Sequence, residues 1–105
     1  MDERLTHLNF TAPLWEWPSR ANWFFVTVPP EESAEISDQP RAPRGFGSVR
    51  VRVSIGGSSW DTSIFPASPT DGLVREYSLP IKRAVRDAEG ISPGDEVAVT
   101  LELLE

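Results

Sequence analysis

The sequence predicts an all-β fold of about six strands and two short helices, arranged either as a barrel or as a compressed sandwich. Apolar residues recur at every second position in several segments, which is the period of a half-buried strand. Ten prolines and seven glycines in 105 residues favour short strands joined by tight turns over long helices. A chain of this length holds one hydrophobic core, so we expect a single domain over residues 1–105.

Two strands are predicted in the first part of the chain. Within residues 6–15, apolar side chains occupy alternate positions: Leu8, Phe10, Ala12 and Leu14. Residues 22–28 are rich in aromatic and β-branched side chains on both faces, as in a central strand, and Pro29 ends this run. We therefore expect Trp23 to fill the core.

The clearest hairpin lies within residues 49–64, where valine and isoleucine alternate with serine and arginine. Gly56 and Gly57 supply the positive φ angles that a two-residue turn requires. A turn at these glycines puts the apolar ladder inside and the charged ladder outside, with Trp60 expected in the core. The predicted pairs are Ile55 with Ser58, Val53 with Trp60, Val51 with Thr62, Val49 with Ile64, Arg52 with Asp61, and Arg50 with Ser63.

Two short helices are predicted. Pro30 suits the first turn of a helix over residues 31–36, which a polar loop over residues 37–44 follows. A second helix is expected to start at Pro80 and to end at Gly90, a natural C-terminal cap. Its apolar residues form one stripe at helical spacing: Ile81, Ala84, Val85 and Ala88.

The remaining turns define the last two strands. Residues 71–72 (Asp-Gly) predict a turn before a strand over 73–79. Pro93 and Gly94 fit the centre of a type II turn, in which Asp95 is expected to accept hydrogen bonds from backbone amides. The final strand then turns alternate apolar residues toward the core: Val97, Val99, Leu101 and Leu103.

Two families share parts of this pattern. The first resemblance is to the closing half of the swapped-hairpin barrels of the AbrB and MazE type, and it rests on residues 79–80, Arg86, 90–91 and 94–97. The spacing between Pro80 and Arg86 is two residues longer here than in that family.

Residues 6–104 resemble a second family more closely, the domain-of-unknown-function family 1905. Its motifs occur in the same order: residues 23–29, 56–66, 71–72, 79–82, Arg86 and 94–97. This resemblance implies a six-stranded double-split β-barrel in one chain, and it implies no activity.

The net charge of −6 opposes binding to nucleic acid and to anionic membranes. The charge is uneven, however. Residues 1–40 carry −5, residues 41–86 carry +5, and residues 87–105 carry −6. Either these segments pair across the sheet, or the middle segment forms a basic face that meets an anionic ligand.

Enzyme and metal chemistry have few candidate residues in this chain. It has no cysteine and one histidine, His7, so thiolate catalysis, disulfides and thiolate metal sites are excluded and we expect no cofactor. No phosphate loop, nucleophile elbow or zinc-protease motif occurs, and neighbouring carboxylates on a strand point to opposite faces. No apolar run has the length of a signal peptide or a membrane span, so we expect a soluble, cytoplasmic protein.

Three functions remain open. The first is a non-catalytic binding module for an anionic small molecule or a protein partner. Its candidate surface is basic and aromatic: Trp15, Trp17, Arg50, Arg52, Lys82 and Arg86. The second is a DNA-binding regulator of the AbrB type, which the acidic net charge opposes, and the third is an enzyme with an unrecognised site. The alternatives for the candidate residues are that the two tryptophans pack over the barrel end and that an acid such as Asp95 fixes Arg86. We expect a monomer or a weak homodimer.

Overall fold

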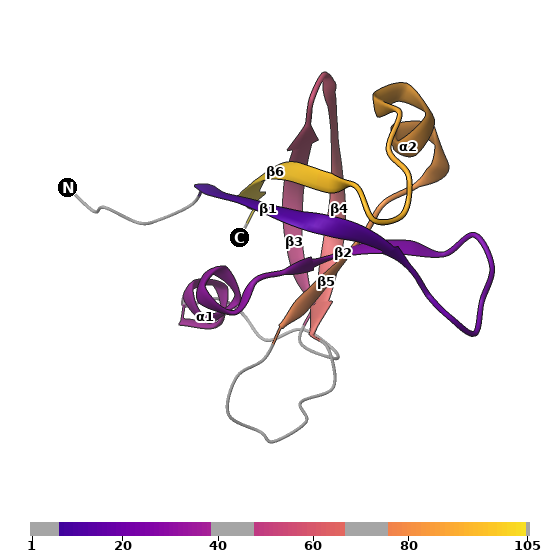
Figure 1. Cartoon of the computed structure of the whole chain (residues 1–105). Helices are drawn as coiled ribbons and strands as arrows, with labels where there is room; N and C mark the ends of the chain where they lie inside the picture. Colours follow the sequence, from indigo (N-terminus) through magenta and orange to yellow (C-terminus); the bar gives the residue numbers. More distant parts are fainter. Residues whose placement is uncertain (1–6, 39–47, 67–75, 105) are drawn as a thin grey trace.

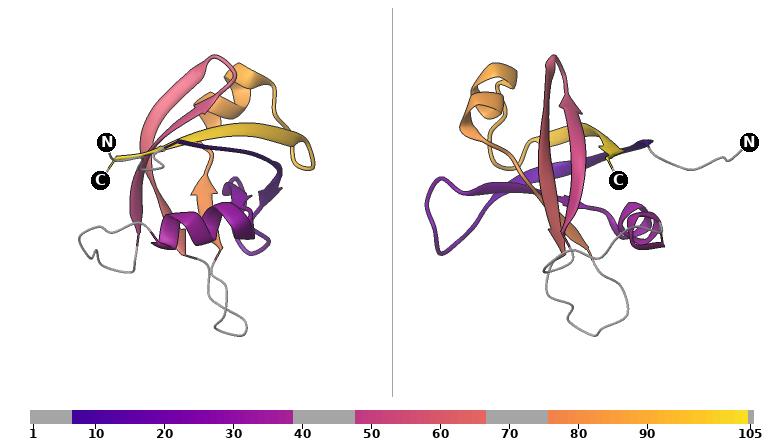
Figure 2. Two further views of the ribbon diagram at one scale, coloured as in Figure 1. Left: turned by 90° about the vertical axis from the view of Figure 1, so that its left-hand side faces the viewer. Right: turned by 180° about the vertical axis from the view of Figure 1, so that it is seen from behind.

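Alternating apolar side chains of six strands meet inside a closed barrel, which has one helix on each of two opposite sides (Figures 1 and 2). This computed structural model describes residues 7–38, 48–66 and 76–104. The elements are β1 His7–Glu16, β2 Phe24–Val28, α1 Pro30–Asp38, β3 Val49–Ile55, β4 Ser58–Pro66, β5 Tyr77–Pro80, α2 Arg83–Glu89 and β6 Glu96–Leu103.

The strand order around the barrel is β1-β2-β5-β4-β3-β6, and every neighbouring pair is antiparallel. The six-stranded barrel with two helices is therefore confirmed, and the sandwich is excluded. Since β6 lies between β1 and β3, the first and the last strand of the chain are neighbours in the barrel. Inward-facing positions of all six strands form one core, in which Val26, Val51 and Leu101 are fully buried.

The β3–β4 hairpin has the predicted register at all six positions. Gly56 takes a φ of 57°, as predicted, whereas Gly57 does not take the positive φ that was predicted for it. The hairpin tip also contacts α2, because a Cβ atom on Gly56 would collide with the carboxylate of Glu89. Ser58 Oγ donates a hydrogen bond of 2.6 Å to the same carboxylate, so Glu89 ties α2 to the hairpin.

The turn before β6 also has the predicted structure. Gly94 has a φ of 92°, and the Asp95 amide donates to the Ser92 carbonyl at 3.0 Å. The Asp95 carboxylate accepts a hydrogen bond of 2.8 Å from the Ser92 amide. Because this carboxylate caps its own turn, the role predicted for Asp95 within the turn is confirmed.

Helix α2 differs from its prediction. Pro80 ends β5 instead of starting the helix, because the Ile81 amide still donates to the Phe24 carbonyl of β2 at 2.9 Å and keeps the chain extended. The predicted stripe is half correct: Ile81 and Val85 are buried, but Ala84 and Ala88 are exposed. The helix has only seven residues and packs on the barrel through Val85 alone, so Ala84 and Ala88 stay in contact with solvent. Gly90, with a φ of 65°, is the predicted C-terminal cap.

Two further predictions concern the chain between these elements. The loop expected over residues 37–44 begins later, since α1 continues to Asp38, and residues 39–44 lie outside the described part of the chain. The turn at 71–72 and the first residues of the strand predicted over 73–79 also lie outside it, whereas β5 covers the end of that strand.

Helix α1 closes one end of the barrel with two fully buried residues, Ser33 and Ile36. Ser33 Oγ donates a hydrogen bond of 3.0 Å to the Val28 carbonyl and accepts one of 3.2 Å from the Tyr77 amide. One hydroxyl group therefore joins α1 to the ends of β2 and β5. The sequence analysis did not single out Ser33.

We predict that Ser33→Ala lowers the free energy of unfolding by about 2 kcal/mol, because the Tyr77 amide and the Val28 carbonyl lose their buried partner. Urea denaturation followed by circular dichroism measures the change. Ser37→Ala is the control on the same helix, since the Ser37 side chain is exposed and makes a long hydrogen bond of 3.3 Å to Tyr77. Equal losses for the two variants would contradict a special role of Ser33.

Candidate functional site

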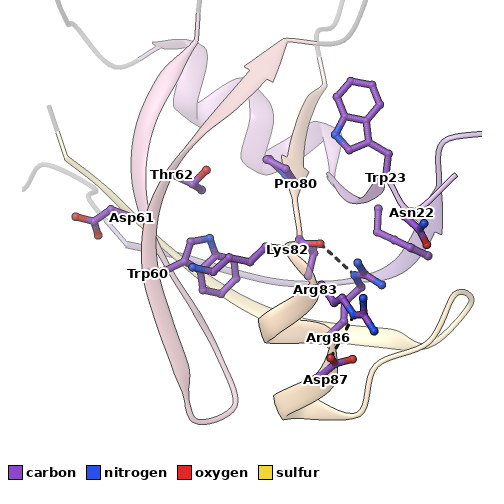
Figure 3. Close-up of a pocket in the computed structure, with 12 residues that line it drawn as sticks. Asn22, Trp23, Trp60, Asp61, Thr62, Pro80, Lys82, Arg83, Arg86 and Asp87 are labelled. Atoms are coloured by element: carbon purple, nitrogen blue, oxygen red, sulfur yellow. Dashed lines mark hydrogen bonds and ion pairs between the residues drawn. The ribbon is translucent and has the colours of Figure 1, made fainter. Parts of the chain in front are cut away.

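A hollow of about 760 Å³ opens between β4, the start of β2 and α2, and we call it the basic depression (Figure 3). Its lining combines aromatic rings with cations, and the residues used below are Trp23, Trp60, Lys82, Arg83 and Arg86. Trp60 reaches it from β4, while the cations come from α2 and from the residue before that helix. The two sides face each other across the hollow (Figure 3).

Lys82 and Arg86 each lie beside an aromatic ring. Lys82 Nζ lies 5.8 Å from the centre of the Trp60 ring. The Arg86 guanidinium carbon lies 3.9 Å from the centre of the Phe24 ring, and Arg86 Nε donates to the Ile81 carbonyl at 3.3 Å. Contacts of this kind orient a cation without neutralising it. Within the described residues, neither Lys82 nor Arg86 has a carboxylate partner, so Asp95 does not fix Arg86.

Two acids also line the basic depression, and each of them is paired with an arginine. Asp87 lies 3.6 Å from Arg83 in a pair whose side chains are largely exposed, so their attraction is weak. Asp61 points away from the other labelled side chains (Figure 3) and accepts two hydrogen bonds from Arg52, at 2.8 and 3.2 Å. These bonds from the Arg52 guanidinium lower the pKa of Asp61 from its usual value, so its charge stays on the outer face.

A second hollow, of about 590 Å³, lies on the outer face of the barrel beside the first, and we call it the aromatic groove. It is lined by Trp17, Trp23, Phe25, Phe65, Pro66, Ser78 and Pro80. The strand register explains this grouping, because Trp15, Phe25 and Pro80 face one another across β1, β2 and β5. Trp23 and Pro80 line both hollows, so the basic depression and the aromatic groove are adjacent.

The structure divides the six predicted site residues among three places. Lys82 and Arg86 lie together in the basic depression. Trp17 lines the aromatic groove, and Trp15 stacks beside it on Phe25 at 5.2 Å. The third pair is Arg50 and Arg52, which lie on the outer face of β3 and line neither hollow, because they alternate with inward-facing valines.

The sequence analysis missed the two tryptophans that complete the site. Trp23 was predicted to lie in the core, but it precedes β2 and is 42% exposed. Trp60 pairs with Val53 and packs against the core as predicted, but it is only half-buried, because it lines the basic depression. The sequence held no signal for the position of Trp23, because residues 22–28 are apolar on both faces; in the structure Phe24, Val26 and Val28 face the core.

Two tests for other kinds of site gave no candidate. Within residues 7–38, 48–66 and 76–104, no three histidine or carboxylate side chains lie close enough to hold a metal ion. None of the helices described here has the length and the apolar character needed to span a membrane.

The comparisons with known proteins identify the family. No curated protein matches the sequence. The sequence model of DUF1905, described as a domain of unknown function, matches residues 10–101, which confirms the resemblance found in the motifs. The chain belongs to the DUF1905 family.

Proposed function

We propose that this domain is a non-catalytic binding module whose basic depression receives the anionic group of its ligand. The observation that supports this proposal is the pair Lys82 and Arg86, two cations without a carboxylate partner among the described residues, facing Trp60 in one hollow. A carboxylate, sulfonate or phosphate in the hollow forms charge-assisted hydrogen bonds with them. Trp60 offers a flat apolar surface beside that anion, which favours a ligand with a planar apolar part.

The test uses 2-naphthalenesulfonate as an anionic probe and 2-naphthol as its uncharged counterpart. We expect the sulfonate to shift the indole N–H resonance of Trp60 and the amide resonances of residues 82–86 in nitrogen-15 spectra. The uncharged probe should bind at least about 5-fold more weakly, because it has no charge for the two cations to pair with. Raising the salt concentration should weaken binding of the sulfonate and leave 2-naphthol unchanged.

Variants of the protein show where on its surface the probe binds. The double variant Lys82→Ala, Arg83→Ala removes two exposed cations that line the hollow, and we expect it to weaken sulfonate binding about 5-fold or more. Arg50→Ala is the matched control, since it removes a cation from the outer face of β3 and should leave binding within about 2-fold. Equal binding of the two probes, or equal effects of the two variants, would refute the proposal.

A further inference from the structure

We propose that the aromatic groove binds an extended, proline-containing segment of a protein partner, and that an acidic residue of the same segment enters the basic depression. This inference rests on the function proposed above and specifies the class of ligand. The groove exposes three large aromatic side chains: Trp17 is 39% exposed, Trp23 42% and Phe65 44%. Exposed aromatic residues gathered in one hollow mark a surface for an apolar partner.

Hydrogen bonds and ring contacts position the side chains of the groove in the absence of a ligand. Trp17 Nε1 donates to Ser19 Oγ at 2.8 Å, and the Trp17 amide donates to the Trp23 carbonyl at 2.7 Å. The Trp17 ring lies 5.8 Å from that of Phe25, and the Trp23 ring lies 5.3 Å from it. Side chains that are already ordered lose little entropy when a ligand arrives, which favours binding.

The topology restricts how a peptide can bind. The strands beneath the aromatic groove pair with one another, β2 with β1 and β5, and β5 with β4, so the groove lies on the face of the sheet and not along an open edge. A peptide must therefore pack its side chains on the aromatic rings. Aromatic grooves take proline-rich segments in the polyproline II conformation, because such segments are extended before binding and present apolar rings.

Trp23 supplies the polar contact that such a segment needs. Its indole N–H has no acceptor within the described residues, whereas the indole groups of Trp15 and Trp17 donate to Thr27 and Ser19. A polyproline II segment leaves its carbonyl groups unpaired, and one of them can accept this hydrogen bond.

The charge around the groove defines the rest of the partner. Arg20 lies over the Trp23 ring, with its guanidinium carbon 4.6 Å from the ring centre. On the other side of Trp23 and Pro80 lies the basic depression with Lys82 and Arg86. Arg20 and the basic depression both lie beside Trp23, and cations next to an apolar groove favour a segment that carries acids beside its apolar residues.

The test is calorimetric titration with a synthetic peptide of about ten residues, made of prolines and leucines with a glutamate near each end. A second peptide carries lysine in place of both glutamates. We expect the acidic peptide to bind at least about 10-fold more tightly than the basic one. Phe65→Ala should weaken its binding at least about 5-fold, because this position is at the protein surface and lines the groove. Leu104→Ala is the matched control: Leu104 is also exposed, lines neither hollow, and should leave binding unchanged.

The outcomes separate the two proposals. Phe65→Ala should leave binding of 2-naphthalenesulfonate unchanged, since Phe65 does not line the basic depression, whereas Lys82→Ala with Arg83→Ala should weaken both ligands. If the sulfonate binds in the basic depression but neither peptide binds, the peptide proposal is wrong and the anion site stands. Equal binding of the two peptides also overturns it. So does tight binding of a single-stranded oligonucleotide with no peptide binding, or a homodimer in sedimentation that Phe65→Ala dissociates.

Discussion

Replacing Leu101 by alanine should lower the free energy of unfolding by about 3 kcal/mol. Leu101 is fully buried in β6, opposite Leu8 of β1 and Val53 of β3. Its side chain therefore fills the barrel where the first and last strands meet. Truncation removes apolar contacts and leaves a cavity that surrounding strands, fixed by hydrogen bonds on both sides, cannot close.

Urea denaturation followed by far-ultraviolet circular dichroism measures this loss, and the melting temperature should fall by more than about 10 °C. Leu104→Ala is the control with the same chemical change, because Leu104 follows the same strand and is 36% exposed. Its free energy of unfolding should stay within about 0.5 kcal/mol of the wild type. A loss below about 1 kcal/mol for Leu101→Ala would mean that the barrel interior is not filled.

The sequence predicted the barrel well where local rules determine pairing. Two glycines between two alternating segments define a hairpin with one register, and the register then determines which side of β3 is apolar. The same reasoning failed over residues 22–28, where both faces are apolar and alternation carries no information about the inside. In that strand, pairing with β1 determines which side chains face the core, since Leu14 pairs with Val26 and both side chains are buried.

The candidate site could be predicted only in part, because it combines elements distant in the sequence. Lys82 and Arg86 were found as cations beside a short helix, and that helix does border a hollow. Arg50 and Arg52 were grouped with them by charge alone, which does not specify a face of the barrel. The prediction that Trp60 faces the barrel interior was correct, but a strand register does not show which inward-facing residues border a hollow and stay partly exposed.

Phe25 should contribute to stability from outside the core, and Phe25→Ala should lower the free energy of unfolding by about 3 kcal/mol. Phe25 is on the outer face of β2, yet it is only 7% exposed. Three tryptophan rings cover it: Trp15 at 5.2 Å, Trp23 at 5.3 Å and Trp17 at 5.8 Å between ring centres. Its loss removes the ring that these three contact in common, so they should become more mobile and more exposed to water.

Two measurements follow from this arrangement. Urea denaturation gives the loss of stability, and tryptophan fluorescence of the folded variant should shift to longer wavelength as the indoles gain contact with water. Phe65→Ala is the matched control, because Phe65 is 44% exposed, contacts none of these three rings and should change stability by less than about 0.5 kcal/mol. If Phe25→Ala destabilises the protein but leaves its fluorescence unchanged, Phe25 does not support the tryptophans. The aromatic groove would then have another origin, because Phe25 forms its floor between Trp17 and Pro80.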